Sequence, residues 1–504
     1  MGIGHVLRCK TLADRLSLLG AEIRFICREH PGHLIRFLNG AGYPISRLPA
    51  PAISRFIRDA DRNDHAAWLG VEQSQDAAQT LEALGGFKPD WLVVDHYGLD
   101  AVWEQLVKPH VGRVLVIDDL ADRCHDCDVL LDQNSYTDLE SRYCALVPVQ
   151  TRRLLGSRFA LLRPEFRKAR ASLRERDGVV RRILVFFGGV DATGETEKAL
   201  DALTNPEFRD IGVDVVIGAT NPREDDIRTR CSQMPNVSLH RQVANMAELM
   251  AAADFSLGAG GTSIWERCCV GLPSAVMVVA ANQSRISRDL DAAGVLLALG
   301  PAAEDGAARF RQVLETVSGI QGRERLLALQ SASLALVDGR GADRVALSMS
   351  DEPARLRRAT IEDADTVWPW RNHPRTRQAS RNWNTITPAE HLAWWNRSLN
   401  DASRVLLIGS RCGMEIGVVR YDLGHAGVAV VSVYLDPDMH RLGLGVALLE
   451  AGNRWLPRYY PAVRELHATI LAQNEASKRA FEAAGFHSSR GRWILKLDQT
   501  KIER

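Results

Sequence analysis

Long hydrophobic runs, a surplus of either charge and low-complexity segments are all absent from this chain of 504 residues. The longest apolar runs, such as residues 272–281, stop well short of the roughly 18 residues that a membrane-spanning helix needs, and the N-terminus lacks a signal-peptide pattern. The 63 Lys and Arg nearly balance the 62 Asp and Glu, without a block of five like charges. These absences argue against membrane and nucleic-acid partners. We therefore expect a soluble, cytoplasmic protein.

Cysteine pairs at zinc-ribbon spacing are also lacking. The nine cysteines are an odd number and are scattered among apolar segments, which favours reduced thiols in a reducing compartment. Cys124 and Cys127 form one CxxC motif around His125, but no second pair follows at metal-ligand spacing. Structural thiols are favoured over a metal or redox site, and no metal is expected.

The length is typical of about three domains. Short apolar strands alternate with helical patterns at 91–95, 113–119 and 128–132, and again at 182–189, 213–218, 253–261 and 272–280. This alternation predicts an α/β fold with two Rossmann-like lobes, residues 1–155 and 156–347, each with a parallel sheet. Polar and small residues then predict a linker at 348–354. A Trp-rich α+β domain is expected at 355–504.

Two glycine loops that follow strands are candidate phosphate sites, because small residues let an anion approach backbone N–H groups. In GAGGTSIWE (258–266), Gly260 and Gly261 permit the approach, Thr262 and Ser263 supply hydroxyls, and Glu266 is placed to bind a ribose diol. The alternative is a tight turn with a capping box between Ser263 and Glu266. The second loop, FFGGVDATG (186–194), carries Gly188 and Gly189. The GxGxxG pattern is absent from both loops, which disfavours a nicotinamide cofactor.

His5 follows Gly4 in a predicted glycine turn at the start of a helical pattern. A neutral imidazole at that position is a competent general base, although a lone histidine is often structural. Tyr97 ends a predicted strand together with Asp95 and His96. Asn282 and Gln283 follow the last strand of the second lobe. These groups converge only if the two lobes face one another.

Eight motifs occur in one order over residues 1–347: GIGHVLRC, WLGVEQSQDA, VVDHYGLD, VIDDLADR, LLDQN, ALLRPEF, GAGGTSIWERCCVGLP and AANQ. Together they resemble the UDP-sugar hydrolases of pseudaminic acid biosynthesis. That family is similar in fold to two-lobed GT-B glycosyltransferases but transfers the sugar to water. It cleaves UDP-2,4-diacetamido-2,4,6-trideoxy-β-L-altropyranose to the free sugar and UDP.

The resemblance implies roles for individual residues. His5 matches the catalytic base, Tyr97 and Asn282 match positions near the sugar, and a metal is not required. The UDP-holding loop is matched by Gly261, Thr262, Ser263 and Glu266. Relatives have a buried strand before the GxGH turn, whereas Met1 directly precedes Gly2 here. We expect either a start site assigned too late or a damaged first lobe.

The C-terminal region contains a third glycine loop. In VVSVYLDPDMHRLGLGVALLEAGNRWL (430–456), Gly443 and Gly445 would expose backbone N–H groups to a pyrophosphate, the alternative being a flexible turn before a helix. With HATILAQNEASKRAFEAAGF (467–486), this segment resembles the GNAT acetyltransferases. The resemblance implies that acetyl-CoA is bound by Val431 and Val433 on a strand, by the loop residues Arg441, Leu442, Gly443, Leu444 and Gly445, and by Asn474 and Ser477.

This region departs from the GNAT pattern at two positions. His440 replaces the usual Arg or Gln before the loop, and Phe481 occupies the position of a proton-donating tyrosine. Water or Tyr434 is then the candidate acid, and Glu415 or Asp436 the candidate base. The tryptophans and Arg371 form either a sugar-nucleotide pocket or a Trp-rich core.

The WRNHP segment (370–374) looks like the GNAT branch that acetylates amino sugars or protein N-termini. Fusion to a hydrolase favours the amino sugar, because the expected hydrolase substrate carries a 4-acetamido group. We therefore expect a bifunctional enzyme that acetylates the 4-amine of a UDP-amino sugar and hydrolyses the UDP-diacetamido sugar. The alternatives are a glycosyltransferase with an alcohol acceptor, an inactive first region that acts as a scaffold, and a tail that acetylates protein N-termini.

Overall fold

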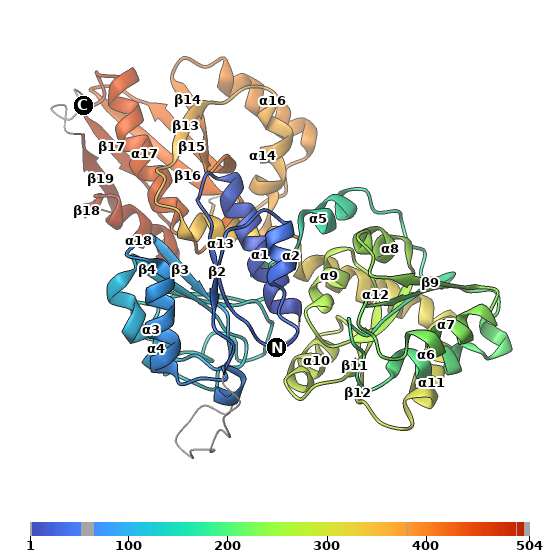
Figure 1. Ribbon diagram of the computed structural model, residues 1–504. Helices are drawn as coiled ribbons and strands as arrows, with labels where there is room; N and C mark the ends of the chain where they lie inside the picture. Colours follow the sequence, from blue (N-terminus) through green and yellow to red (C-terminus); the bar gives the residue numbers. More distant parts are fainter. Residues whose placement is uncertain (1–2, 52–64, 381, 490, 498–504) are drawn as a thin grey trace. The chain divides into compact units, whose positions relative to one another are not determined.

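The computed structural model describes residues 3–51, 65–380, 382–489 and 491–497 (Figure 1). The chain divides into two compact units, Met1–Val345 and Ala346–Arg504. Helix α13 (Gly341–Met349) carries the chain from one unit into the other and extends into the segment expected to be a linker. None of the helices in the described ranges is both long and apolar enough to cross a membrane.

The first part of unit 1 contains two parallel sheets. Strands β1 (Phe25–Arg28) and β2 (Ile45–Leu48) pair with one another, and a separate four-stranded sheet has the order β3-β4-β5-β6. Its strands are β3 (Trp91–Val94), β4 (Arg113–Ile117), β5 (Val129–Asp132) and β6 (Arg152–Leu155). The helices are α1 (Ile3–Leu18), α2 (Ile35–Gly40), α3 (Gln73–Leu84) and α4 (Ala101–Val107). Strands β4 and β5 are almost wholly buried, as expected of apolar runs covered on both faces.

The second part of unit 1 is a six-stranded parallel sheet with the order β12-β11-β10-β7-β8-β9. The strands are β7 (Arg182–Phe186), β8 (Gly212–Ile217), β9 (Val237–Arg241), β10 (Phe255–Ala259), β11 (Ser274–Val278) and β12 (Leu297–Pro301). The remaining helices of the unit are α5 (Pro164–Ala171), α6 (Glu195–Leu203), α7 (Glu224–Ser232), α8 (Met246–Ala252), α9 (Ser263–Cys269), α10 (Gln283–Ala292), α11 (Gly306–Ser318) and α12 (Ile320–Leu336). Apolar clusters cover both faces of the sheet.

The strand order of this sheet reverses between β7 and β10, which are neighbours although they are far apart in sequence. Open parallel sheets bind ligands at such switch points, beyond the carboxyl ends of the strands. The two predicted glycine loops follow these two strands. The topology therefore brings Gly188 and Gly189 to the same sheet edge as Gly260 and Gly261.

Unit 2 contains a seven-stranded sheet with the order β13-β14-β15-β16-β17-β19-β18, parallel only between β16 and β17. Its strands are β13 (Arg355–Arg358), β14 (Arg404–Arg411), β15 (Met414–Leu423), β16 (Val428–Leu435), β17 (Glu465–Ala468), β18 (His487–Ser489) and β19 (Arg492–Lys496). Its helices are α14 (Asp363–Asn372), α15 (Pro374–Gln378), α16 (Pro388–Leu399), α17 (Leu444–Tyr459) and α18 (Glu475–Ala483). The predicted fold class, two parallel α/β lobes followed by an α+β domain, is confirmed.

Candidate active site

His5 and Asp95 form a close pair in unit 1. His5 lies in the first turn of α1, because the helix already begins at Ile3, so the predicted glycine turn around Gly4 and His5 is wrong. Nδ1 of His5 lies 2.7 Å from Oδ1 of Asp95, which follows β3. The side chains are 14% and 3% exposed, respectively.

The ionisation of Asp95 fixes the tautomer of His5. Burial alone would raise the pKa of Asp95, but the Arg8 guanidinium and His5 hold it well below its usual range. Nε and Nη2 of Arg8 donate to the two carboxylate oxygens at 2.7 and 2.6 Å. An ionised carboxylate only accepts hydrogen bonds, so Nδ1 of a neutral His5 carries the proton and Nε2 has the free lone pair. This is the arrangement required of a general base.

Arg8 also connects Asp95 to the next strand of the sheet. Its Nη1 donates to Asp119 at 2.9 Å, just beyond the carboxyl end of β4. Tyr97 packs edge-on against His5, with 4.8 Å between the ring centroids. Burial and then the Asp119 carboxylate raise the pKa of Tyr97, which keeps the phenol neutral. Tyr97 therefore lies in contact with the imidazole, as the sequence-based site requires.

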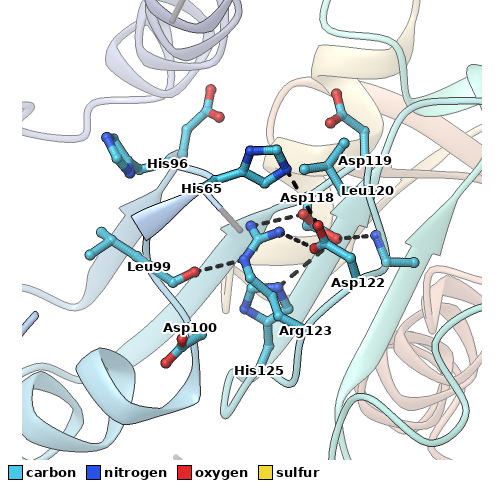
Figure 2. A network of polar contacts seen from close by, with 12 residues as sticks. His65, His96, Leu99, Asp100, Asp118, Asp119, Leu120, Asp122, Arg123 and His125 are labelled. Atoms are coloured by element: carbon cyan, nitrogen blue, oxygen red, sulfur yellow. Dashed lines mark hydrogen bonds and ion pairs between the residues drawn. The ribbon is translucent and has the colours of Figure 1, made fainter. Parts of the chain in front are cut away.

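A second polar network lies at the carboxyl end of β4 (Figure 2). Arg123 lies between Asp118 and Asp122, at 2.9 and 2.7 Å, and its Nε donates to the carbonyl of Leu99. His65 also approaches Asp122, to 3.5 Å. These contacts stabilise the loops that follow β3 and β4.

The histidine of the CxxC motif belongs to this network. His125 is buried, and its Nδ1 lies 2.7 Å from Glu104. Burial raises the pKa of the neighbouring Cys127 thiol, which disfavours a reactive thiolate. Both observations fit the structural role that the sequence favours for this motif.

The loop between β10 and α9 contains the strongest candidate phosphate site. A side chain at Gly260 would collide with Ser287, because an added Cβ would lie 2.8 Å from Oγ. The loop therefore presents bare backbone at this position. Beneath the loop, Arg267 donates to the carbonyl of Ala259 at 2.9 Å and to Oγ of Ser263 at 3.4 Å.

Glu266 does not form the capping box that the sequence allowed as an alternative. Thr262 is the N-cap of α9 and makes no side-chain capping bond. Glu266 instead pairs with Arg163 at 3.4 Å. Burial raises the pKa of Glu266, while Arg163 opposes that shift.

The loop after β7 differs from the loop after β10. Gly188 has a φ of +93°, and a side chain at Gly218 would collide with the backbone of Gly189. The carboxylate of Asp191 accepts from the amides of Glu195 and Thr196 at 2.9 and 2.8 Å, so the first turn of α6 already has an anionic cap. A phosphate at this loop is therefore limited to the amides near Gly188 and Gly189.

Contacts within unit 1 join loops at the carboxyl ends of the four-stranded and the six-stranded sheet. An added Cβ at Gly4 would lie 3.4 Å from Oγ1 of Thr262, so the starts of α1 and α9 are neighbours. Trp265 donates to Asn134 at 3.2 Å, and Arg285 pairs with Asp138 at 2.6 Å. His5 is therefore the direct neighbour in sequence of Gly4, which approaches the β10–α9 loop at Thr262.

Two further predicted residues flank this loop on α10. Asn282 is the exposed N-cap of α10 and makes no side-chain capping bond. Oε1 of Gln283 accepts from the amide of Val279 at 3.1 Å, and Nε2 lies 3.8 Å from the position of a Cβ added at Gly261. Asn282 thus has an exposed side chain, whereas Gln283 helps to fix the loop.

The acetyl-CoA residues predicted in unit 2 lie along an open strand edge and a helix start. Within the described residues, the ladder between β16 and β17 covers only Val428 to Val430, so it ends before Val431 and Val433. Such a divergence leaves strand N–H and C=O groups available to an extended ligand. At the start of α17, Gly443 has a φ of +75°, Arg441 has a φ of +63°, and no side-chain cap is made. Leu442 and Leu444 are buried and anchor the loop, whereas Gly445 approaches α18.

The other predicted groups of unit 2 fall into two sets. Asn474 caps α18 by accepting from the amide of Ser477 at 3.1 Å, and buried Phe481 packs against Phe486. Glu415 pairs with Arg357 at 2.5 Å, and Asp436 accepts from the amide of Asp438 at 3.0 Å. Both candidate bases thus have local partners.

Three tryptophans contribute to an apolar core cluster of unit 2, with Trp395 fully buried and Trp370 and Trp394 packed around it, whereas Trp383 is exposed. Burial raises the pKa of Tyr434, so this candidate acid carries its proton. Arg371 lies close enough to influence it, and burial lowers the pKa of Arg371.

Two residues of the unit 1 site, Arg8 and Arg267, are missing from the sequence-based set, and Asp95 is named there only as a strand-end residue and not as the partner of His5. Arg8 lies three residues after His5, which places both on one helix face, and this spacing was the available signal. Asp95 and Asp119 each end an apolar run, but their shared partner on α1 becomes visible only in three dimensions. The role of Arg267 beneath its own loop has no sequence signature.

Comparison with known proteins identifies the class of each region. Residues 354–487 match the family model described as an acetyltransferase (GNAT) domain. The spore coat polysaccharide biosynthesis protein SpsG of Bacillus subtilis is 27% identical over 354 residues, covering 69% of this chain and 94% of SpsG. The UDP-2,4-diacetamido-2,4,6-trideoxy-beta-L-altropyranose hydrolase of Campylobacter jejuni is 26% identical over 251 residues, 50% of this chain and 77% of that enzyme.

One relative aligns with nearly the whole chain. The uncharacterized protein MJ1062 of Methanocaldococcus jannaschii is 20% identical over 533 residues, 99% of this chain and 97% of the relative. The family-model match at residues 354–487 shows that the chain is an enzyme with a GNAT acetyltransferase domain. This domain follows a region related to proteins named for polysaccharide biosynthesis and nucleotide-sugar hydrolysis.

Proposed function

We propose that unit 1 hydrolyses a UDP-linked diacetamido sugar, UDP-2,4-diacetamido-2,4,6-trideoxy-β-L-altropyranose, to the free sugar and UDP. The observation that carries this proposal is the 2.7 Å pair of His5 and Asp95 at the start of α1, next to the loop between β10 and α9. The similarity to a hydrolase of this name supports the choice of substrate. Gly260, Gly261, Thr262 and Ser263 would hold the diphosphate, Glu266 the ribose, and Tyr97, Asn282 and Gln283 the sugar.

The hydrolysis needs one base and a stabilised leaving group. Nε2 of His5 takes a proton from a water molecule while the water oxygen bonds to the anomeric carbon. The bond from that carbon to the diphosphate oxygen breaks, and UDP leaves with the electron pair. Asp95 stabilises the imidazolium that forms. Backbone amides of the loop stabilise the negative charge that develops on the diphosphate.

In unit 2, the same proposal assigns transfer of an acetyl group from acetyl-CoA to the 4-amine of the UDP-amino sugar precursor. The neutral amine attacks the thioester carbon and the carbon–sulfur bond breaks. The nitrogen then loses one proton to become the amide, and coenzyme A leaves as a thiolate that takes up a proton. The edge of β16 would bind the pantetheine arm, and residues Arg441 to Gly445 the pyrophosphate. The ladder divergence at Val431 and the uncapped start of α17 support this assignment.

Hydrolysis is tested by incubating the full chain with the UDP-diacetamido sugar in water and following products by NMR. We expect free sugar and UDP without an added acceptor. His5→Ala should lower the rate by about 10²- to 10⁴-fold, whereas His110→Ala, an exposed histidine elsewhere in unit 1, should leave it unchanged. Product formation only with an added alcohol would establish a glycosyltransferase instead. Intact substrate after long incubation, with His5→Ala equal to wild type, would establish a scaffold.

Acetyl transfer is tested with labelled acetyl-CoA offered to the UDP-4-amino sugar and to peptides with free N-termini. Label should appear in the sugar and be lost in Gly443→Val, because a β-branched residue is strained at a φ of +75°. Gly413→Val carries a similar strain, at a φ of +70°, in the β14–β15 hairpin and is the matched control. Label in peptides alone would contradict the proposed acceptor.

A further inference from the structure

Arg267 is a buried cation without an anionic partner. Its side chain is 1% exposed, and no carboxylate lies within ion-pair distance of it among the described residues. Nε of Arg267 is buried and makes no hydrogen bond within that part of the chain. A buried charge that is neither paired nor fully hydrogen-bonded is strongly unfavourable, so its position calls for an explanation.

The guanidinium joins the two ends of the β10–α9 loop. One end nitrogen donates to the carbonyl of Ala259, the last residue of β10, and the other approaches Oγ of Ser263, the first residue of α9. Gly258 leaves the space that the guanidinium occupies, because an added Cβ there would lie 2.5 Å from Nη1. Arg267 thus fixes the loop from its inner side.

Another buried arginine of unit 1, Arg176, uses its donors more completely than Arg267 does. Arg176 is also buried. Its three side-chain nitrogens donate hydrogen bonds to the backbone carbonyls of five residues: Met250, Ala251, Ala253, Val270 and Gly271. The donors of Arg176 are therefore satisfied by the fold itself. Those of Arg267 are only partly used.

A second unsatisfied group lies beneath the same loop. Oγ of Ser287 on α10 is buried and has no hydrogen-bond partner within the described chain. It lies 2.8 Å from the position of a Cβ added at Gly260. Two incompletely satisfied polar side chains from different helices therefore support one short stretch of glycine backbone.

We propose that Arg267 is a positioning residue that holds the β10–α9 loop in its anion-binding form and supplies the counter-charge for the diphosphate of the bound nucleotide. This inference rests on the proposed function of unit 1. It predicts that Arg267 acts on the diphosphate through the loop and contributes little to binding of the nucleoside. Acetyl transfer by unit 2 should not depend on it.

The experiment measures binding of UDP and of uridine to the full chain by calorimetry, for wild type, Arg267→Lys and Arg267→Met. Arg267→Met should weaken UDP binding by about ten- to a hundredfold and uridine binding by less than about threefold, since the lost interaction is with charge. Arg267→Lys keeps the charge and should recover most of the UDP affinity. Arg176→Lys changes an arginine whose donors are all used. Any loss of affinity in this variant should be equal for UDP and for uridine.

The unfolding transition of unit 1 in the same preparations checks that each variant is folded, and acetyl transfer checks that unit 2 is unaffected. If Arg267→Met does not fold, the uncharged Arg267→Gln replaces it, because a structural role would lower UDP and uridine binding by the same factor. In the uncharged variant, equal losses of UDP and uridine binding, or no loss of UDP binding, overturn the role of Arg267. A wild-type chain that binds no UDP overturns the proposed function of unit 1 and this inference with it.

Discussion

At the scale of single residues, the ionised carboxylate of Asp95 decides which nitrogen of His5 carries the proton. Asp95→Asn removes the negative charge and allows the imidazole to adopt the other tautomer. We expect kcat for UDP release to fall by about 10²- to 10⁴-fold with a nearly unchanged KM, since the residues proposed to bind the substrate do not include Asp95. Steady-state kinetics measures this. Asp122→Asn, which alters the Arg123 network without touching His5, is the control, and an equal loss there would refute the role of Asp95.

The stability of unit 1 should depend on pH through Asp132, a buried residue at the end of β5. Burial and then the Asp119 carboxylate raise its pKa to about 8, whereas an unfolded aspartate titrates near about 4. Folding therefore takes up a proton between these values, and the free energy of unfolding should decrease as the pH rises from 5 to 8. Urea titrations at three pH values measure the slope.

Asp132→Asn should flatten that slope, because the amide does not titrate. Asp126→Asn, at a carboxylate that pairs with Lys108, should leave the slope as it is in wild type. A steep decrease that persists in Asp132→Asn would assign the pH dependence to another group.

At the scale of helices and strands, β15 and α17 meet around an unsatisfied hydroxyl. Tyr421 is fully buried, and its hydroxyl has no partner within the described residues. Gly452 of α17 provides its space, since an added Cβ would lie 2.2 Å from the oxygen. Tyr421→Phe removes a desolvated polar group and should stabilise unit 2 by about 1 kcal/mol.

The matched comparison is Tyr143→Phe in unit 1, where the hydroxyl contacts Asp118 and Asp132 at 3.0 Å each. This change should destabilise unit 1 by about 1–3 kcal/mol, because it leaves two buried carboxyl groups with fewer hydrogen-bond partners. Urea denaturation measures both variants. Destabilisation by Tyr421→Phe would show that its hydroxyl is satisfied in solution.

The elements that the sequence predicts well are those determined by local pattern. Buried parallel strands such as β4 and β10 appear as short apolar runs, and the glycines after β10 mark its loop. The start of α1 was placed too late, because Gly4 adopts a helical conformation although glycine usually ends or precedes helices. The alternative, a capping box between Ser263 and Glu266, is not formed, because Thr262 is the N-cap of α9 and because Arg163, about one hundred residues away, pairs with Glu266. Contacts of that kind leave no local pattern.

At the scale of the whole molecule, the division at Val345 and Ala346 predicts two separable unfolding transitions. Each should respond to its own ligand, because binding stabilises only the unit that contains the site. UDP at about a hundred times its Kd should stabilise unit 1 by about 2.7 kcal/mol, and coenzyme A should do the same for unit 2. Differential scanning calorimetry measures both shifts. One transition that moves with either ligand would contradict the two-unit division.

The shared space of Gly258 and Arg267 has an evolutionary consequence. A methyl group at position 258 and a guanidinium from position 267 cannot occupy that volume together. The residue tolerated at one position is therefore expected to depend on the residue at the other. Relatives with a larger residue at position 258 should have a shorter side chain at position 267. In an alignment of homologues, these two positions, nine residues apart, should vary together.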